Sequence, residues 1–260
     1  MPGVPPTHAE ITATLRAAGC VFAEDEATLL LAEAAPADLE RMVARRVAGE
    51  PLEVVVGWAE FCGLRIAIDP GVFVPRRRTE LLVREAARLA DGPAVVLDLC
   101  CGSGALGVAL AHLVPVELYA VDVEPAAVRC ARRNVAAVGG QVFEGDLDEP
   151  LPESLRGRVD LLVANVPYVP STEIARMPPE AREHEPRVTL DGGADGLDVL
   201  RRVAAVAPRW LAPGGHLLVE TSEEQAVAAV AAFVAAGLAA RVVVDDEAGA
   251  TVVVGTRPDE

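Results

Sequence analysis

Asn165, Val166, Pro167 and Tyr168 could together bind a planar NH2 group. The side-chain oxygen of Asn165 and the backbone carbonyl of Val166 can accept the two hydrogens of an amide or aniline-like nitrogen. Pro167 restricts the turn, and the ring of Tyr168 can lie against the flat group. Taken alone, the four residues fit an ordinary turn after the apolar run 159–164 equally well. Together with the features below, they are predicted to be catalytic and substrate-binding, and we call residues 165–168 the acceptor motif.

A glycine-rich turn precedes the acceptor motif in the sequence. Residues 95–100 form an apolar run, and Gly102, Gly104 and Gly107 follow it with the spacing G-x-G-x-x-G, ahead of an Ala/Leu-rich stretch. This pattern is typical of a strand, a turn and a helix, and it lets the backbone approach a ligand closely beside a helix N-terminus. We therefore predict that Cys100, Gly102 and Gly104 contact a nucleoside-containing cofactor.

Two further apolar runs carry carboxylates at their ends. Asp122 ends the first, where it can accept hydrogen bonds from both hydroxyls of a ribose. Asp146 ends the second, residues 141–147, where it can accept a hydrogen bond from an adenine amino group. Val123 and Leu147, which follow these carboxylates, complete the predicted nucleoside site.

Asp98 distinguishes between two classes of nucleoside cofactor. A carboxylate at the mouth of the turn would repel the pyrophosphate of a dinucleotide, whereas it would attract an ammonium group. S-adenosyl-L-methionine carries such an ammonium group. The sequence thus predicts S-adenosyl-L-methionine as the cofactor, contacted by Asp98 and Asn165, and methyl transfer rather than hydride transfer.

Composition favours a globular protein and disfavours a nucleic-acid partner. The 260 residues are 52% apolar, which suits a catalytic domain with its own core and a small accessory domain. The net charge of −16 disfavours a chain that grips long nucleic acids, because such binding depends on neutralising phosphates. Local basic clusters are expected to be solvated, except that Arg76, Arg77 and Arg78 precede Thr79, a candidate helix N-cap, and are candidates to meet an acidic partner surface.

Cysteines and histidines show no spacing typical of a metal site or a disulfide framework. No basic-then-apolar signal sequence and no membrane-length apolar stretch is present. We therefore expect a cytoplasmic protein with reduced thiols, no bound metal and no membrane association.

The spacing of apolar residues and the positions of glycine and proline divide the chain into three parts. Helical patterns at residues 7–19, 24–35 and 37–48 predict a substrate-recognition domain over residues 1–50. Residues 51–75, with apolar runs at 54–56 and 64–68, are expected to form a hairpin-like connector. Alternating strands and helices over residues 76–260, ending in valine-rich runs at 241–245 and 251–256, predict an α/β catalytic domain with a C-terminal antiparallel hairpin.

With these features in place, the chain resembles the release-factor glutamine N5-methyltransferase family over most of its length. The resemblance rests on the acceptor motif together with residues 49–52, 57–64, 70–76, 79–82 and 185–197. It implies a Rossmann-like fold that binds S-adenosyl-L-methionine, and methylation of the glutamine amide in the Gly-Gly-Gln loop of a peptide-chain release factor. It also implies substrate contacts from the residues in matching segments, which are Phe73, Pro75, Arg76 and Glu185.

Three departures leave the substrate open. The family usually has proline where this chain has Val166, and Pro followed by an acidic residue where it has Arg77 and Arg78. The C-terminal strand also lacks the basic residues common just before it. A divergent relative with another client is one alternative, and a non-catalytic binding protein is a second. N6-methylation of adenine in RNA or DNA is a third, because an exocyclic amine fits the same motif, although the acidic charge leads us not to expect nucleic acid as the direct substrate.

Overall fold

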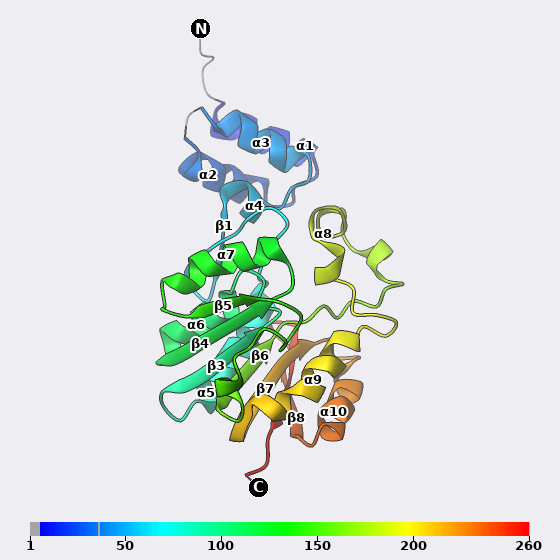
Figure 1. The fold of residues 1–260 in the computed structure, drawn as a ribbon. Coiled ribbons are helices and arrows are strands. Elements are labelled where there is room, and N and C mark those ends of the chain that lie inside the picture. Colours follow the sequence, from blue (N-terminus) through cyan, green and yellow to red (C-terminus); the bar gives the residue numbers. More distant parts are fainter. Residues whose placement is uncertain (1–5, 36, 260) are drawn as a thin grey trace.

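The computed structural model describes residues 6–35 and 37–259. Helices at the N-terminal end stand above a large twisted sheet, and the chain ends on the opposite side of that sheet (Figure 1). A short two-stranded hairpin joins the two parts.

The N-terminal helices pack around a core of their own. They are α1 (His8–Ala17), α2 (Ala23–Glu33), α3 (Leu39–Val47) and α4 (Leu52–Val56). Thr7 begins α1 with a capping box, in which it accepts a hydrogen bond from the backbone N–H of Glu10 while the Glu10 side chain accepts one from Thr7. Ile11, Leu30 and Val55 are buried in this core. The three predicted helices are confirmed.

The prediction of a strand at residues 54–56 was wrong. These valines form the end of α4, which Gly57 ends in the left-handed conformation with φ of 87°. The burial of Val55 among the helices outweighs the preference of valine for strands. The hairpin instead consists of β1 (Trp58–Phe61) and β2 (Leu64–Ala67), which pair antiparallel.

The main sheet has seven strands in the order β5-β4-β3-β6-β7-β9-β8. The strands are β3 (Ala94–Leu99), β4 (Val116–Asp122), β5 (Gln141–Glu144), β6 (Val159–Ala164), β7 (Leu211–Thr221), β8 (Ala239–Asp245) and β9 (Ala250–Thr256). β3 to β7 are parallel, whereas β9 runs antiparallel to both β7 and β8. The predicted C-terminal antiparallel hairpin is confirmed. Asp146 lies beyond the end of β5, because that strand ends sooner than its apolar run.

Helices cover both faces of the sheet. On one face, α5 (Glu80–Leu89) and α6 (Ala105–Leu113) share a core cluster with the hairpin and with Val96 of β3. On the other, α9 (Asp198–Trp210) and α10 (Ala226–Ala235) share a cluster with Leu97 of β3. Neighbouring residues of one strand thus enter opposite clusters, which explains why the parallel strands are continuous apolar runs. The remaining helix beside the sheet is α7 (Pro125–Ala136).

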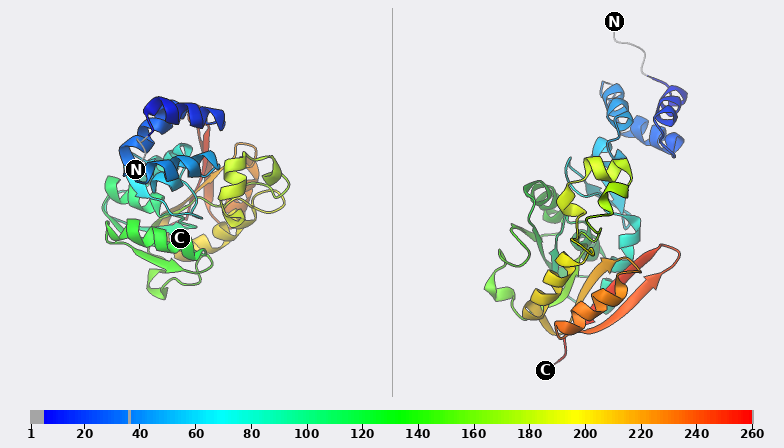
Figure 2. Two further views of the ribbon diagram at one scale, coloured as in Figure 1. Left: turned by 90° about the horizontal axis from the view of Figure 1, so that it is seen from above. Right: turned by 90° about the vertical axis from the view of Figure 1, so that its right-hand side faces the viewer.

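An excursion between β6 and α9 carries α8 (Pro179–His184) toward the N-terminal helices, as both Figure 1 and the right view of Figure 2 show. An ion-pair cluster joins the two regions. Arg46 of α3 is bound to Glu26 of α2, with Nε 2.7 Å from Oε2, and to Glu180 of α8, with Nη1 3.2 Å from Oε2. The N-terminal helices are therefore tied directly to a loop of the sheet domain.

Candidate active site

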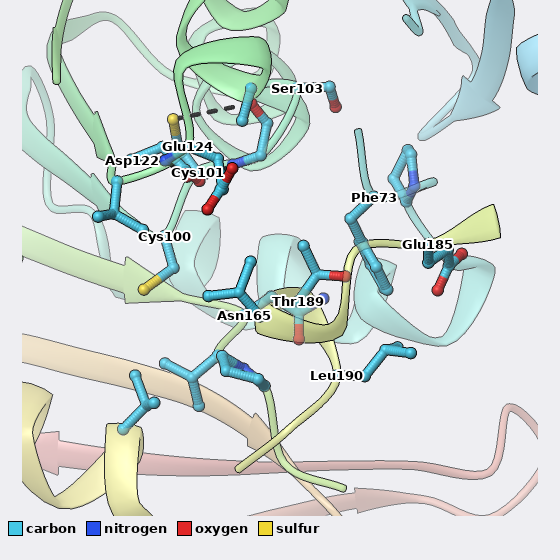
Figure 3. Close-up of a pocket in the computed structure, with 18 of the residues that line it drawn as sticks. Phe73, Cys100, Cys101, Ser103, Asp122, Glu124, Asn165, Glu185, Thr189 and Leu190 are labelled. Atoms are coloured by element: carbon cyan, nitrogen blue, oxygen red, sulfur yellow. Dashed lines mark hydrogen bonds between the residues drawn. The ribbon is translucent and has the colours of Figure 1, made fainter. Parts of the chain in front are cut away.

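The carboxyl ends of β3, β4 and β6 open onto a single pocket. Parallel strands bring their carboxyl ends to one edge of the sheet, so segments far apart in the sequence meet there. The predicted site residues that line this pocket are Phe73, Pro75, Arg76, Cys100, Gly102, Asp122, Val123, Asp146, Leu147, Asn165, Val166, Pro167, Tyr168 and Glu185. In Figure 3, Asn165 lies between Asp122 on one side and Phe73 and Glu185 on the other.

Alternate residues of the turn after β3 lie in the left-handed region. Cys100 has φ of 56°, Gly102 of 55° and Gly104 of 77°. Cys100 is a non-glycine residue in this region, where a side chain adds strain of the kind that gathers at ligand sites. No heavy atom lies within 4 Å of the place where Gly102 would carry a Cβ, which leaves space in front of the turn.

Gly104 has a packing role in place of the predicted contact. It precedes α6 and does not line the pocket. A Cβ at this position would lie 2.9 Å from Val135 of α7, so glycine lets α6 and α7 approach each other.

Asp98 lies beneath the turn and not at its mouth as we predicted. It is fully buried in β3 and is not among the residues that line the pocket. Its Oδ2 accepts a hydrogen bond from the backbone N–H of Gly107 at 3.1 Å, whereas Oδ1 has no partner among the described residues. Burial raises the pKa of Asp98 to about 7. Asp98 therefore holds the first turn of α6 and lies outside the pocket.

Asp122 fastens the end of β4 to the turn. Its Oδ2 accepts a hydrogen bond from the backbone N–H of Gly102 at 2.8 Å, and its Oδ1 accepts one from Glu124 at 2.9 Å. Burial raises the pKa of Asp122, although the backbone donors oppose this. Each carboxylate oxygen keeps a second lone pair with which it can accept a hydrogen bond from a ligand.

Asp146 is paired with a residue that the sequence did not reveal. Arg202 of α9 lines the pocket and places Nη2 2.7 Å from Oδ2 of Asp146. The neighbouring Leu147 has φ of 50°, a second strained non-glycine residue at the pocket wall. The sequence around Asp146 does not indicate this pairing, because Arg202 is 56 residues away along the chain.

The acceptor motif is held at Val166 and at Tyr168. Val166 is 2% exposed and lies in the core cluster that contains Leu197 and Leu200. The hydroxyl of Tyr168 accepts a hydrogen bond from Nη2 of Arg78 at 2.6 Å and donates one to Oε1 of Glu220 at 3.1 Å. Burial raises the pKa of Tyr168 to about 12, so its hydroxyl is protonated near neutral pH.

A glycine-rich loop before α9 braces the motif from behind. The backbone N–H of Val169 donates to Leu190 at 3.0 Å, and Val169 accepts from Gly192 at 2.9 Å. Nε2 of Gln225 donates to the backbone carbonyl of Tyr168 at 2.9 Å. A Cβ on Gly192 would lie 2.7 Å from the carbonyl oxygen of Pro167, so the loop can pack this closely only as glycine.

Arg76 and Glu185 meet at the other side of the pocket. Their side chains form an ion pair, and Glu185 is 6% exposed. Burial raises the pKa of Glu185, which the Arg76 guanidinium partly offsets. Arg76 also lies over the ring of Phe73, at 5.0 Å from its centre. All four residues predicted from the matching segments line the pocket, and three of them, Phe73, Arg76 and Glu185, contact one another through Arg76.

Two members of the arginine cluster have partners within the chain. Arg76 and Arg78 are bound to Glu185 and Glu220 respectively. The expectation that the cluster meets an acidic partner surface stays a prediction. Thr79 does precede α5, but its side chain makes no capping hydrogen bond and its Oγ1 is buried without a partner among the described residues.

Within residues 6–35 and 37–259, no three His, Cys, Asp or Glu side chains come together as a metal site. The five cysteines are free. Over the same ranges, no helix has both the length and the apolar character needed to cross a bilayer.

Comparison with known proteins agrees with this architecture. Residues 63–179 match the family described as Methyltransferase small domain. The 4-amino-L-phenylalanine/4-methylamino-L-phenylalanine methyltransferase of Streptomyces pristinaespiralis is 38% identical over 87% of this chain and 80% of its own length. A methyltransferase structure from Pyrococcus furiosus superposes with a TM-score of 0.58 and 15% identity, over 75% of this chain and 90% of that one. This last likeness concerns the fold alone, and the predicted fold class is confirmed.

The release factor glutamine methyltransferase of Geobacter sulfurreducens is 43% identical over 219 residues, which are 83% of this chain and 76% of that protein. A second protein of the same description, from Mycolicibacterium smegmatis, is 40% identical over 85% of each chain. These matches extend over most of both chains, and the resemblance predicted from the sequence is confirmed. The chain belongs to the release factor glutamine methyltransferase family.

Proposed function

We propose that this chain transfers a methyl group from S-adenosyl-L-methionine to the side-chain amide nitrogen of a glutamine in a peptide-chain release factor. One observation carries the proposal. The acceptor motif lines the same pocket as the turn after β3 and the carboxylate that ends β4. A cofactor site and an NH2 site therefore adjoin each other. Membership of the family supports this choice of substrate.

The residues at the β3 and β4 end of the pocket suit S-adenosyl-L-methionine. The left-handed turn leaves open space in front of Gly102, and Asp122 has lone pairs free for ribose hydroxyls. The unpartnered Oδ1 of buried Asp98 adds negative charge beneath the turn when ionised, which favours a cationic ligand above it. Asp146 keeps Oδ1 available for the adenine amino group while Oδ2 is paired with Arg202. When bound, S-adenosyl-L-methionine supplies an electrophilic methyl group.

The acceptor motif orients the nitrogen. A glutamine amide is a poor nucleophile, because its lone pair is delocalised into the carbonyl group. Asn165 Oδ1 and the backbone carbonyl of Val166 would accept both N–H groups, which directs the lone pair toward the methyl group and stabilises positive charge on nitrogen. Tyr168 would hold the amide plane. Burial of the Val166 side chain anchors this position, although valine lacks the restricted φ of proline.

The N-terminal helices are proposed to select the protein substrate. We extend this unit to Val56, since Val55 belongs to its core, and regard the β1–β2 hairpin as the connector to the catalytic domain. The ion pair between Arg46 and Glu180 fixes the helices relative to α8, whose excursion follows the acceptor motif. A protein held by the helices could thus present a loop to the pocket.

A second acceptor class also has support. The relative from Streptomyces pristinaespiralis is described as acting on 4-amino-L-phenylalanine, and an aniline NH2 group would fit the same two oxygen acceptors. Adenine in RNA or DNA would fit them too, but a net charge of −16 opposes binding to phosphate backbones.

The proposal can be tested by measuring transfer of a labelled methyl group from S-adenosyl-L-methionine to purified release factors of the organism that encodes this chain. 4-Amino-L-phenylalanine and RNA are added as competing acceptors. We expect labelling at the Gly-Gly-Gln glutamine. Asn165→Ala should lower turnover about 10²-fold or more, by analogy with the loss of one oxyanion-hole donor, while calorimetry shows cofactor binding largely intact. Unchanged turnover in this variant would remove the acceptor motif from the mechanism. Labelling of the amino acid alone would establish the second class.

A further inference from the structure

We infer that Arg78 is a positioning residue, which fixes the ring of Tyr168 in the acceptor motif. The inference rests on the proposed function, because it concerns how this chain orients the NH2 group of the substrate. Position 78 is also one of the departures from the resembled family, where an acidic residue is usual. The inferred role is therefore a property of this chain.

Three segments that are distant in the sequence meet at Tyr168. Arg78 lies in the 3-10 turn Arg77–Thr79 before α5, Tyr168 follows β6, and Glu220 is in β7. Nε of Arg78 donates to Oε1 of Glu220 at 3.0 Å, and its Nη2 donates to the Tyr168 hydroxyl at 2.6 Å. That hydroxyl donates to the same Oε1 at 3.1 Å. The three hydrogen bonds form a closed triangle.

The buried carboxylate of Glu220 anchors this triangle, although the Arg78 side chain is 44% exposed. The side chain of Glu220 is 2% exposed, and its Oε2 has no partner among the described residues. A buried carboxylate needs its cation, since removing one member of such a pair leaves an uncompensated charge. The planar guanidinium can donate to two acceptors at once, which the single ammonium of lysine does less well. Arg78 is thus held in place by Glu220 and in turn holds the Tyr168 hydroxyl.

The position of the ring matters for the reaction. Tyr168 is three residues after Asn165 in the acceptor motif, and both line the pocket. The guanidinium carbon of Arg78 also lies 5.9 Å from the centre of the Tyr168 ring, which adds an attraction between cation and ring. When Arg78 is lost, the ring gains freedom, and the amide plane that it supports is less well defined. The loss should appear in kcat more than in cofactor affinity.

A double-mutant cycle tests the inference. The variants are Arg78→Met, Arg78→Lys, Tyr168→Phe and Arg78→Met with Tyr168→Phe. Arg84→Met is the matched control, because Arg84 forms an ion pair with Asp245 at 2.6 Å and does not line the pocket. We expect Arg78→Met and Tyr168→Phe each to lower kcat about 10-fold, and the double variant to lose about as much as one alone. Arg78→Lys should be intermediate, and Arg84→Met unchanged. Cofactor affinity should stay within about twofold throughout.

A second measurement does not depend on the substrate. The chain has two tyrosines, so ring-labelled tyrosine gives NMR signals that Tyr119→Phe assigns directly. Arg78→Met should alter and broaden the Tyr168 signals while those of Tyr119 stay in place, and Arg84→Met should alter neither. If the wild-type chain methylates no glutamine, the proposed function fails, and this measurement still decides the positioning role.

Additive losses in the cycle, full activity of Arg78→Lys, or unchanged Tyr168 signals in Arg78→Met would each overturn the inference. A merely structural Arg78 would lower the unfolding temperature of Arg78→Met while kcat per folded molecule stayed at the wild-type value.

Discussion

Gly196→Ala should separate support of the acceptor motif from general stability. Gly196 has φ of 78°, and a Cβ there would lie 2.2 Å from the carbonyl oxygen of Tyr168 and 2.3 Å from Nε2 of Gln225. Alanine therefore has two costs, the left-handed backbone and the overlap. Gly237 provides a matched control, because it has φ of 84° and no heavy atom within 4 Å of an added Cβ.

The two costs can be estimated separately. A left-handed alanine costs about 1–2 kcal/mol, which both variants should lose in unfolding free energy. Relief of the overlap in Gly196→Ala requires the contact to lengthen from 2.2 Å to at least 3.0 Å, a displacement of 0.8 Å. Breaking the hydrogen bond between Gln225 and Tyr168 adds about 1 kcal/mol. Because a shift near 1 Å can cost about 10²-fold in rate, we expect kcat to fall by about 10- to 10²-fold in Gly196→Ala only.

The assay compares urea unfolding, cofactor binding and methyl transfer on the same preparations of the two variants. Cofactor affinity should match the wild type in both, since neither glycine lines the pocket. If Gly196→Ala kept the kcat of Gly237→Ala, or if both lost activity in proportion to their stability, the support of the motif by this loop would be refuted.

Two other variants test the buried carboxylate and the link to α8. Burial raises the pKa of Asp98 to about 7, above the value of about 3.9 in an unfolded chain, so its stabilising contribution is present below about pH 4 and is lost as the pH rises through 7. Asp98→Asn should therefore flatten the pH dependence of unfolding free energy between these values in cofactor-free protein, and an unchanged slope would contradict the raised pKa. Glu180→Gln removes the half-exposed arm of the Arg46 cluster, and we expect KM for a protein acceptor to rise severalfold while stability changes by less than about 1 kcal/mol. Glu117→Gln, which breaks the half-exposed ion pair with Arg158 in the sheet domain, should leave KM unchanged.

The sequence predicted what depends on short-range pattern. Apolar runs gave the parallel strands, and the residues directly after them, such as Asp122 and Asn165, line the pocket because strand ends meet at one edge. It did not predict the pairing of Asp146 with Arg202, since such a contact depends on how α9 crosses the sheet. It also misplaced Asp98, because a carboxylate near a turn can lie on either side of it, and periodicity gives no information about which.

At the valines of residues 54–56, the local preference was clear and the prediction was still wrong. Their side chains favour a strand, but these residues form a helix because Val55 is buried in the core of the N-terminal helices. Arg78 stood out in the sequence as a departure from the family and as part of a basic cluster, and neither feature identified its partners. Its partners, Tyr168 and Glu220, lie 90 and 142 residues away and could be found only in the folded chain.

The bridge between Val169 and Asp191, with the hydrogen bond from Ser171 to the carbonyl of Gly193, closes the base of the α8 excursion. Apart from Glu180 and Glu185, which are bound to Arg46 and Arg76, the segment between these points is joined to the fold at this base, so its outer part can change in length and content without moving the acceptor motif. The entropy of closing such a loop grows by only about 0.6 kcal/mol for each doubling of its length. Evolution can therefore exchange the surface that meets a substrate while the pocket beneath it stays intact, which offers a physical route by which proteins of similar sequence come to act on different molecules.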